Sequence, residues 1–364
     1  EIFVSMECVV DDVEHLQKVL RALQWRGFKK DKKVHLTIVP SQGLRFTLTT
    51  DAKDAKCTLS LKADEFFRSW DIHEALRGHE QQQNGNNNGE GDDGDEAMGV
   101  GGGADATDDG DEGGERRLEL VITLSALITS VELFNEGKAV TLRYNPEAGD
   151  EDRDPFIVSV VDGDDTCDSK LNTYYLFGTE EAEIPFEPQG ADLFSMLPSL
   201  LYQALDVFSS NTDNKNANVV VRVWPAGTAD YVLSMGVEGD STSSCVDYPN
   251  DKKIFSRFNV RQHRRVVYSL RSLQILGKGL KIGRDATVYI DVHGIMHVKL
   301  IVPHHGRVDG RISLLEYTIN SVIDMDHQEQ PEGEGEGYAD GEGQDAHMHD
   351  DGQGHQWTEM DGWM

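Results

Sequence analysis

One pattern recurs four times along this chain: an amphipathic helix followed by short strands in which apolar and polar residues alternate. The helix patterns begin near Asp11, Thr123, Phe194 and Ser269. The last three starts lie 71 and 75 residues apart, and the first interval becomes 76 residues once a 36-residue low-complexity segment, Glu80–Glu115, is set aside. A near-constant period indicates duplicated units within one architecture.

Each unit predicts one helix that covers the apolar face of half-buried antiparallel strands. In the first unit, Asp11 and Glu14 have capping-box spacing, and Leu16, Leu20 and Leu23 fall on one helical face. The helical stripes of the later units are Leu124, Leu127, Ile128, Val131 and Phe134; Leu197, Leu200, Leu201, Ala204, Leu205 and Phe208; and Leu270, Leu273, Leu276 and Leu280. We therefore predict an α+β fold with two domains of two units each, at residues 1–177 and 191–323, joined by a linker at 178–190.

The formal charge of −31 belongs mainly to two segments. Glu80–Glu115 holds 12 acidic residues and Asp324–Met364 holds 13, and neither contains Lys or Arg. Both have too few apolar residues to offset the entropy of ordering, so we predict a disordered insert at 80–115 and a disordered tail at 324–364. No apolar run reaches the roughly 18 residues of a membrane span. The four widely spaced cysteines favour a reduced intracellular compartment.

The second half of the chain carries the most specific motifs. Cys245-Val246-Asp247-Tyr248-Pro249 ends a strand pattern; Phe255 and Phe258 precede a basic strand that ends at Tyr268, and a Leu-rich helix follows. Leu315-Glu316-Tyr317 lies in the last strand, before the acidic tail. In order and spacing these segments resemble the Rad-one family, a subunit of the heterotrimeric nine-one-one checkpoint clamp and a relative of proliferating cell nuclear antigen. The resemblance covers Ile2 to Ile323 without the insert.

The resemblance implies a DNA sliding-clamp fold, in which helices line a ring and antiparallel sheets lie outside. Helices that face DNA in such rings carry Lys and Arg, which neutralise phosphates without reading sequence. The candidates here are Lys18, Arg21, Arg26, Arg271, Lys278 and Lys281. The second and third helices show Ser125, Thr129, Ser199 and Asp206 instead, which favours a ring completed by other subunits. For any single charge, solvation of an exposed helix face remains the alternative.

The same resemblance implies a nuclear, non-catalytic scaffold. Its expected partners are two paralogous clamp subunits, a clamp loader, double-stranded DNA without sequence specificity, repair enzymes and activators of the checkpoint kinase. Partner peptides of clamps dock beside the interdomain linker, so Phe177, Ile184 and Phe186 are candidates, with packing on the sheet as the alternative. Subunit contacts through edge strands are expected near Cys57–Lys62 or Lys170–Phe177, and near Ile254–Tyr268 or Arg311–Asn320.

Other patterns do not support a chemical site. The glycines at 99–103 lack the strand and helix of a dinucleotide loop, and no cofactor, metal or catalytic residue is expected. His304 and His305 fall at a predicted hairpin turn, where we expect exposure. A solvated strand face is favoured for Arg257, Arg261, Arg264 and Arg265, with contact to DNA or to a partner subunit as the alternative. The alternatives left open are a homotrimeric replication clamp, a 3'-5' DNA exonuclease, and an acidic chaperone whose acidic segments are the active parts.

Overall fold

The structure is a computed structural model. It describes residues 2–25, 29, 31–76, 117–133, 139–146, 155–162, 165–175, 184–211, 217–238, 243–304 and 312–322. The predicted insert, the predicted tail, Arg26, Phe134, Phe177 and His305 lie outside these ranges. Within them, no helix combines the length and the apolar character that a membrane crossing needs. Glu1–Ile323 groups as one compact unit.

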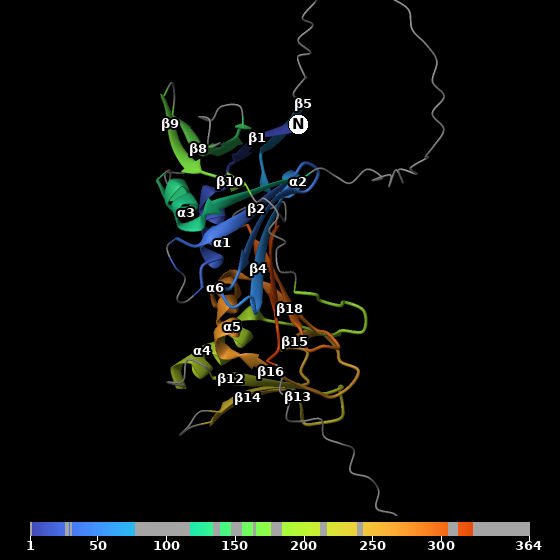
Figure 1. The fold of residues 1–364 in the computed structure, drawn as a ribbon. Helices are drawn as coiled ribbons and strands as arrows, with labels where there is room; N and C mark the ends of the chain where they lie inside the picture. Colours follow the sequence, from blue (N-terminus) through green and yellow to red (C-terminus); the bar gives the residue numbers. More distant parts are fainter. Residues whose placement is uncertain are drawn as a thin grey trace, which may run out of the picture. The chain divides into compact units, whose positions relative to one another are not determined.

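The described elements run four times through a strand, a helical segment and further strands (Figure 1). The first run is β1 (Ile2–Val10), α1 (Val13–Ala22), β2 (Lys33–Val39), β3 (Gly43–Thr49), β4 (Ala55–Lys62), α2 (Ala63–Phe66) and β5 (Ser69–Leu76). The second is β6 (Leu118–Thr123), α3 (Leu124–Glu132), β7 (Val140–Tyr144), β8 (Pro155–Asp162), β9 (Asp165–Asn172) and β10 (Tyr174–Tyr175).

The third run is β11 (Asp192–Met196), α4 (Pro198–Asn211), β12 (Asn218–Val223), β13 (Tyr231–Glu238), β14 (Ser243–Pro249) and β15 (Phe255–Asn259). The fourth is β16 (Arg264–Ser269), α5 (Leu270–Leu273), the 3-10 turn η2 (Gln274–Leu276), α6 (Gly277–Ile282), β17 (Asp285–Ile290), β18 (Met296–Pro303) and β19 (Ile312–Ile319). The predicted domain limits at 177, 190 and 323 stay predictions.

Three antiparallel sheets organise these strands. Their orders are β5-β1-β7-β8-β9, β10-β6-β2-β3-β4-β19-β18-β17-β11-β15, and β14-β13-β12-β16. In the ten-stranded sheet, β4 of the first run pairs with β19 of the last, from Ser60 opposite Leu314 to Ala55 opposite Ile319. We call this pairing the β4–β19 seam, because it makes one sheet out of strands from both halves of the chain.

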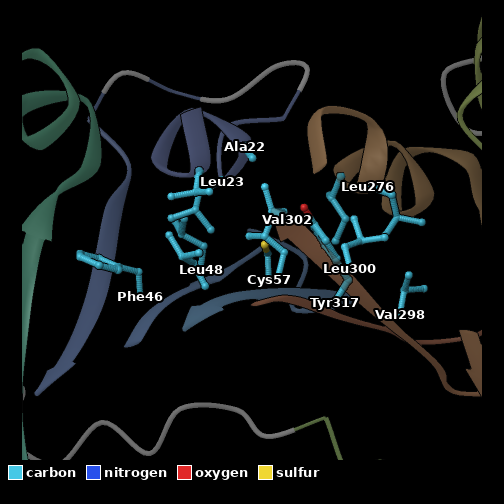
Figure 2. Packing of buried hydrophobic residues seen from close by; sticks show 14 of the residues in the cluster. Ala22, Leu23, Phe46, Leu48, Cys57, Leu276, Val298, Leu300, Val302 and Tyr317 are labelled. Carbon is cyan, nitrogen blue, oxygen red and sulfur yellow. The ribbon is translucent and has the colours of Figure 1, made fainter. Parts of the chain in front are cut away.

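The helices α1 and α6 pack against the same side of the ten-stranded sheet (Figure 2). Alternate residues of β3, β4, β18 and β19 point toward them, among them Phe46, Cys57, Leu300 and Tyr317, all fully buried (Figure 2). Neighbouring helices also touch one another: α3 contacts α1, α1 contacts α6, and α6 contacts α4. The period-two strands and the helical stripes of the sequence thus share one core, as their amphipathic patterns require.

Several local details differ from the sequence-based expectation. The N-cap of α1 is Asp12 rather than Asp11, and its Oδ1 accepts a hydrogen bond of 2.9 Å from the backbone N–H of His15. The helix α4 begins at Pro198, so Leu197 lies before it rather than on its apolar stripe, and Leu197 is 51% exposed.

The fourth helix is divided into α5, η2 and α6, and two glycines begin its last part. A Cβ on Gly279 would collide with the Tyr317 hydroxyl and would lie 2.9 Å from Leu300 Cδ1. Gly279 therefore allows α6 to lie directly on β18 and β19. A Cβ on Gly277 would meet nothing within 4 Å.

These two glycines give a matched test of helix packing. Gly279→Ala should lower the free energy of unfolding by about 1–3 kcal/mol, because the buried Tyr317 side chain must move. Gly277→Ala should raise it by up to about 1 kcal/mol, since alanine is the better helix former. Urea unfolding of both variants checks this, and equal effects would contradict the close approach of α6 to the seam.

Candidate nucleic-acid interface and linker site

The helical layer brings predicted DNA-facing residues from distant parts of the chain together. The β4–β19 seam places α1 of the first run beside α6 of the last. As a result, Arg21 of α1 and Lys278 of α6 line one cavity of about 990 Å³, together with Trp25 and with Glu132 of α3. A sequence pattern shows the basic face of each helix, but not that the two faces meet.

Acidic partners hold part of this basic group in place. Arg21 Nη2 lies 2.8 Å from Glu132 Oε1, and the Arg21 Nε donates to the same oxygen at 2.9 Å. The Lys281 Nζ lies 4.7 Å from the ring centroid of Tyr202, whose hydroxyl donates to Asp206 Oδ1 at 3.2 Å. The helices α3 and α4 therefore contribute groups that orient the basic side chains of α1 and α6.

The positive charges on this surface lie close enough together to shift the pKa of Lys278. Burial lowers the pKa of Lys278, and the charges of Arg21 and Lys281 lower it further. The pKa of Lys281 is raised, chiefly by its interaction with Tyr202. Mutual repulsion of three cations costs free energy, and an anion bound between them would relieve it.

The remaining basic candidates lie on the same helices or outside the described residues. Lys18 lies half-buried in α1, and Arg271 lies exposed in α5. Arg26 is outside the described residues. The spans of α3 and α4 contain no Lys or Arg, so the basic surface is confined to α1, α5 and α6.

Part of the predicted linker lies against β17 and β18. Ile184 and Phe186 are half-buried, and Phe177 is outside the described residues. The Phe186 ring stacks on His297 of β18, with centroids 4.9 Å apart, and meets Tyr289 edge-on at 6.2 Å. Packing of the linker on the sheet, the alternative raised by the sequence, thus occurs for Phe186.

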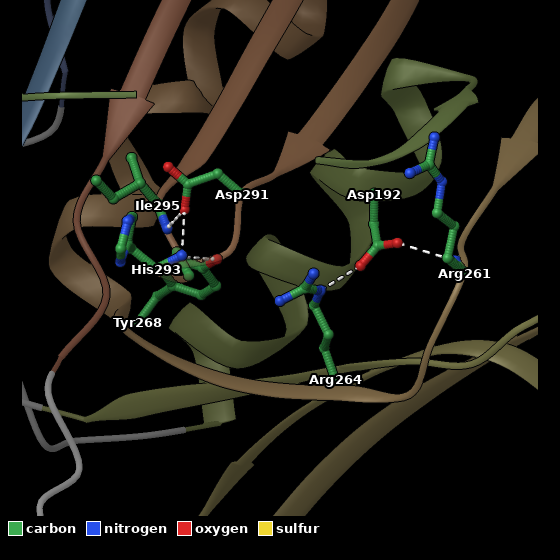
Figure 3. Close-up of polar contacts among 8 residues, drawn as sticks. Asp192, Arg261, Arg264, Tyr268, Asp291, His293 and Ile295 are labelled. Atoms are coloured by element: carbon green, nitrogen blue, oxygen red, sulfur yellow. Dashed lines mark hydrogen bonds and ion pairs between the residues drawn. The ribbon is translucent and has the colours of Figure 1, made fainter. Parts of the chain in front are cut away.

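Two buried carboxylates fix the surroundings of the linker (Figure 3). Asp291 accepts hydrogen bonds from the backbone N–H groups of His293, Ile295 and Glu187, so it fastens the linker to the β17–β18 turn. Asp192 accepts from the backbone N–H of Arg261 at 2.9 Å and forms an ion pair with the Arg264 guanidinium.

The Asp192 contacts correct the expectation of a solvated strand face for Arg264. Only 14% of the Arg264 side chain is exposed, because its buried carboxylate partner holds it inward. The strand pattern around Arg264 gave no sign of its burial, because the carboxylate partner, Asp192, lies 72 residues earlier in the chain.

The expectation of an exposed histidine at the β18–β19 turn is also wrong. His304 is 7% exposed and lies against His15, with ring centroids 3.7 Å apart. The partner comes from the first helix of the chain, so the local turn pattern carried no signal of this burial.

Two of the four expected subunit-contact strands are used within the chain. Cys57–Lys62 lies in β4 and Arg311–Asn320 includes β19, and these two strands pair with each other. Each pattern showed a strand with an unassigned neighbour, but not that the neighbour was internal. In the described part of the chain the outer strands are β5 and β9, β10 and β15, and β14 and β16, so β9 and the β15–β16 region remain as candidates.

Comparison with protein families identifies the family of this chain. The chain matches the family described as "Repair protein Rad1/Rec1/Rad17" over residues 5–302. No curated protein sequence matches it. The family match covers the basic residues of α1, α5 and α6 and the linker residues Ile184 and Phe186.

The surroundings of His297 give a pH-dependence that can be measured. A hydrogen bond from His297 and another from Lys299 lower the pKa of Glu316 from 4.5 to about 2. Because the folded pKa lies below the unfolded one, this stabilisation is complete above about pH 4.5 and is lost as the pH falls toward 2.

Glu316→Gln should therefore flatten the fall in urea midpoint in this acid window, compared with the unsubstituted protein. Glu187→Gln is the control, because Glu187 also lies near a histidine, 3.8 Å from His293, but on an exposed site. Parallel profiles for the unsubstituted protein and Glu316→Gln would contradict the assignment.

Proposed function

Because the chain belongs to the Rad1/Rec1/Rad17 family of repair proteins, which are clamp subunits related to proliferating cell nuclear antigen, we propose that it serves in a DNA-encircling checkpoint clamp. In this proposal the chain is a non-catalytic subunit of a nuclear heterotrimer. The ring is placed on DNA at sites of damage, activates checkpoint signalling and recruits repair enzymes. Each half contributes two units, with helices toward DNA and sheets outside.

The observation that best supports the proposal is the helical layer across the β4–β19 seam. A clamp must present one face to DNA without reading sequence, and basic helix residues meet this need through phosphate contacts. Arg21, Lys278 and Lys281 lie on this layer, and the charges of Arg21 and Lys281 lower the pKa of Lys278. No other feature of the described residues combines helices from both halves with clustered positive charge.

The uneven charge of the layer favours a heterotrimer over a homotrimeric ring. The helices α1, α5 and α6 are basic, whereas α3 and α4 present Ser125, Thr129 and Asp206. Three copies of this chain would leave an arc without Lys or Arg at each α3 and α4. Two different subunits with more basic helices would supply a larger part of the positive lining.

The outer strands and the linker provide the proposed protein contacts. The β9 edge and the β15–β16 region are the proposed sites of neighbouring subunits, since an outer strand can extend a sheet across an interface. Ile184 and Phe186 are proposed to meet partner peptides. The fastening of Glu187 to Asp291 keeps that part of the linker close to β17 and β18.

Removal of one cation from the helical layer tests the DNA-facing surface. In the purified complex, Lys278→Gln should make the plot of log binding constant against log salt shallower by about one, because one phosphate contact is lost. Double-stranded DNA of unrelated sequences should show the same change.

Arg45→Gln is the matched control for this measurement. Arg45 lies in β3 between the buried Leu44 and Phe46, so it points to the side of the sheet away from the helices. Its removal should leave the salt dependence unchanged. Equal changes in the two variants would mean that the helical layer is not the DNA-facing surface.

The mass of the native complex tests the subunit arrangement separately. A tag on this chain should recover a one-to-one-to-one assembly with two different clamp-like chains, measured by native mass spectrometry. A homotrimer would replace the heterotrimer in the proposal, and a monomer bound to histones would move the function to the acidic segments.

A further inference from the structure

A buried polar cluster lies where helix α1 meets the end of β18. Asp12 precedes α1, His15 lies in its first turn, and His304 follows Pro303, the last residue of β18. His15 is 3% exposed and His304 is 7% exposed. One potential ligand atom from each of these three residues lies within 4.8 Å of the other two.

In both histidines of the cluster, Nε2 is the ring nitrogen that faces Ser313. The Nε2 of His15 lies 3.0 Å from Ser313 Oγ, and the Nε2 of His304 lies 3.5 Å from the same oxygen. The other ring nitrogen of His304, Nδ1, lies 3.6 Å from Asp12 Oδ2. Ser313 thus orients both rings through Nε2, which is how outer hydrogen bonds orient histidines that bind metals through the opposite nitrogen.

We propose that Asp12, His15 and His304 form a binding site for a divalent transition metal of the zinc class, which joins the start of α1 to the β18–β19 hairpin. Two imidazoles and one carboxylate are ligands that zinc accepts at distances of about 2.0–2.2 Å. Neighbouring ligand atoms in a tetrahedral zinc site are about 3.3 Å apart, and the Asp12–His304 distance of 3.6 Å is already close to this.

The two rings need only a local adjustment to converge on one ion. They are tilted by 30° with centroids 3.7 Å apart. In the proposed site, rotation about χ2, a torsion that is soft in histidine, redirects the nitrogen lone pairs toward the ion. Asp12 needs no large change either, because Oδ1 caps the helix while Oδ2 faces His304.

The surroundings of the cluster suit a bound ion. The Phe66 ring lies 5.2 Å from the His304 ring and 6.0 Å from the His15 ring, so an apolar side chain shields the cluster from water. The Asp12 side chain is 22% exposed, which leaves a route for an ion from solvent. The full charge of Asp12 exceeds the partial positive charge of about one half at the start of α1.

The first test is metal binding by the full-length chain, with His347, His349 and His355 replaced by Ala so that they cannot compete for the ion. Co²⁺ absorption in the visible range, followed by displacement with Zn²⁺, should show one site per chain. Asp12→Asn should weaken Zn²⁺ binding at least tenfold, while Asn retains the ability to cap α1. Asp11→Asn is the matched control and should bind as before, because Asp11 pairs with Arg68 instead.

A second pair of variants examines the histidines. His304→Asn should abolish the one-to-one Co²⁺ spectrum, and Ser313→Ala should weaken Zn²⁺ binding by about tenfold through loss of ring orientation. His297→Ala is the control, since His297 lies near the carboxylate of Glu316 but belongs to no group of three metal-ligating side chains among the described residues.

The stability readout separates metal binding from a merely structural role. Zn²⁺ should raise the thermal midpoint of the unsubstituted protein and of Asp11→Asn, but not that of Asp12→Asn or His304→Asn. If these last two variants are less stable without metal yet bind Zn²⁺ as tightly as their controls, the cluster is only a structural polar network and the proposal fails. Absence of a Zn²⁺-dependent midpoint shift in the unsubstituted protein would overturn it as well.

Discussion

The β4–β19 seam is the interaction on which the rest of the structure depends. Six residue pairs join a strand from the first quarter of the chain to the last described strand. Each net hydrogen bond contributes only about 1 kcal/mol, so the seam relies mainly on the apolar side chains that it buries. Cys57, Leu59, Leu315 and Tyr317 have at most 1% exposure and face the helices. Loss of this pairing would separate α1 from α6 and disperse the basic surface.

The sequence predicted those features that depend on residues close together in the chain. Alternation in β2, β3 and β4 and the stripe of Leu16, Leu20 and Leu23 indicate strands and a helix because side-chain direction repeats every two or about 3.6 residues. The basic residues of α1 and α6 could be assigned to polar faces for the same reason. The family resemblance is confirmed by the match over residues 5–302.

Features that depend on distant partners could not be predicted in this way. Arg264 and His304 are polar residues beside turns, and local patterns favour exposure for both. Each is buried because a partner far along the chain satisfies it, Asp192 for Arg264 and the Asp12–His15 segment for His304. The same limit explains why β4 and β19 were predicted to contact other subunits. A strand pattern indicates that a strand can pair, but it does not show which strand is its neighbour.

Polar contacts lie at both ends of the seam. They help to determine the register, that is, which residues of β4 face which residues of β19. At one end, Ser313 of β19 meets His15 and His304. At the other end, Asp54 accepts a hydrogen bond from the Ser272 hydroxyl of α5, and its backbone carbonyl accepts from the N–H of Asn320 at 2.8 Å. A shift of one residue would disrupt these contacts and turn the side chains of one strand, Cys57 of β4 or Tyr317 of β19, toward the opposite face. The apolar side chains therefore supply most of the attraction between the halves, while the two polar groups determine which residues face each other and so keep Arg21 beside Lys278.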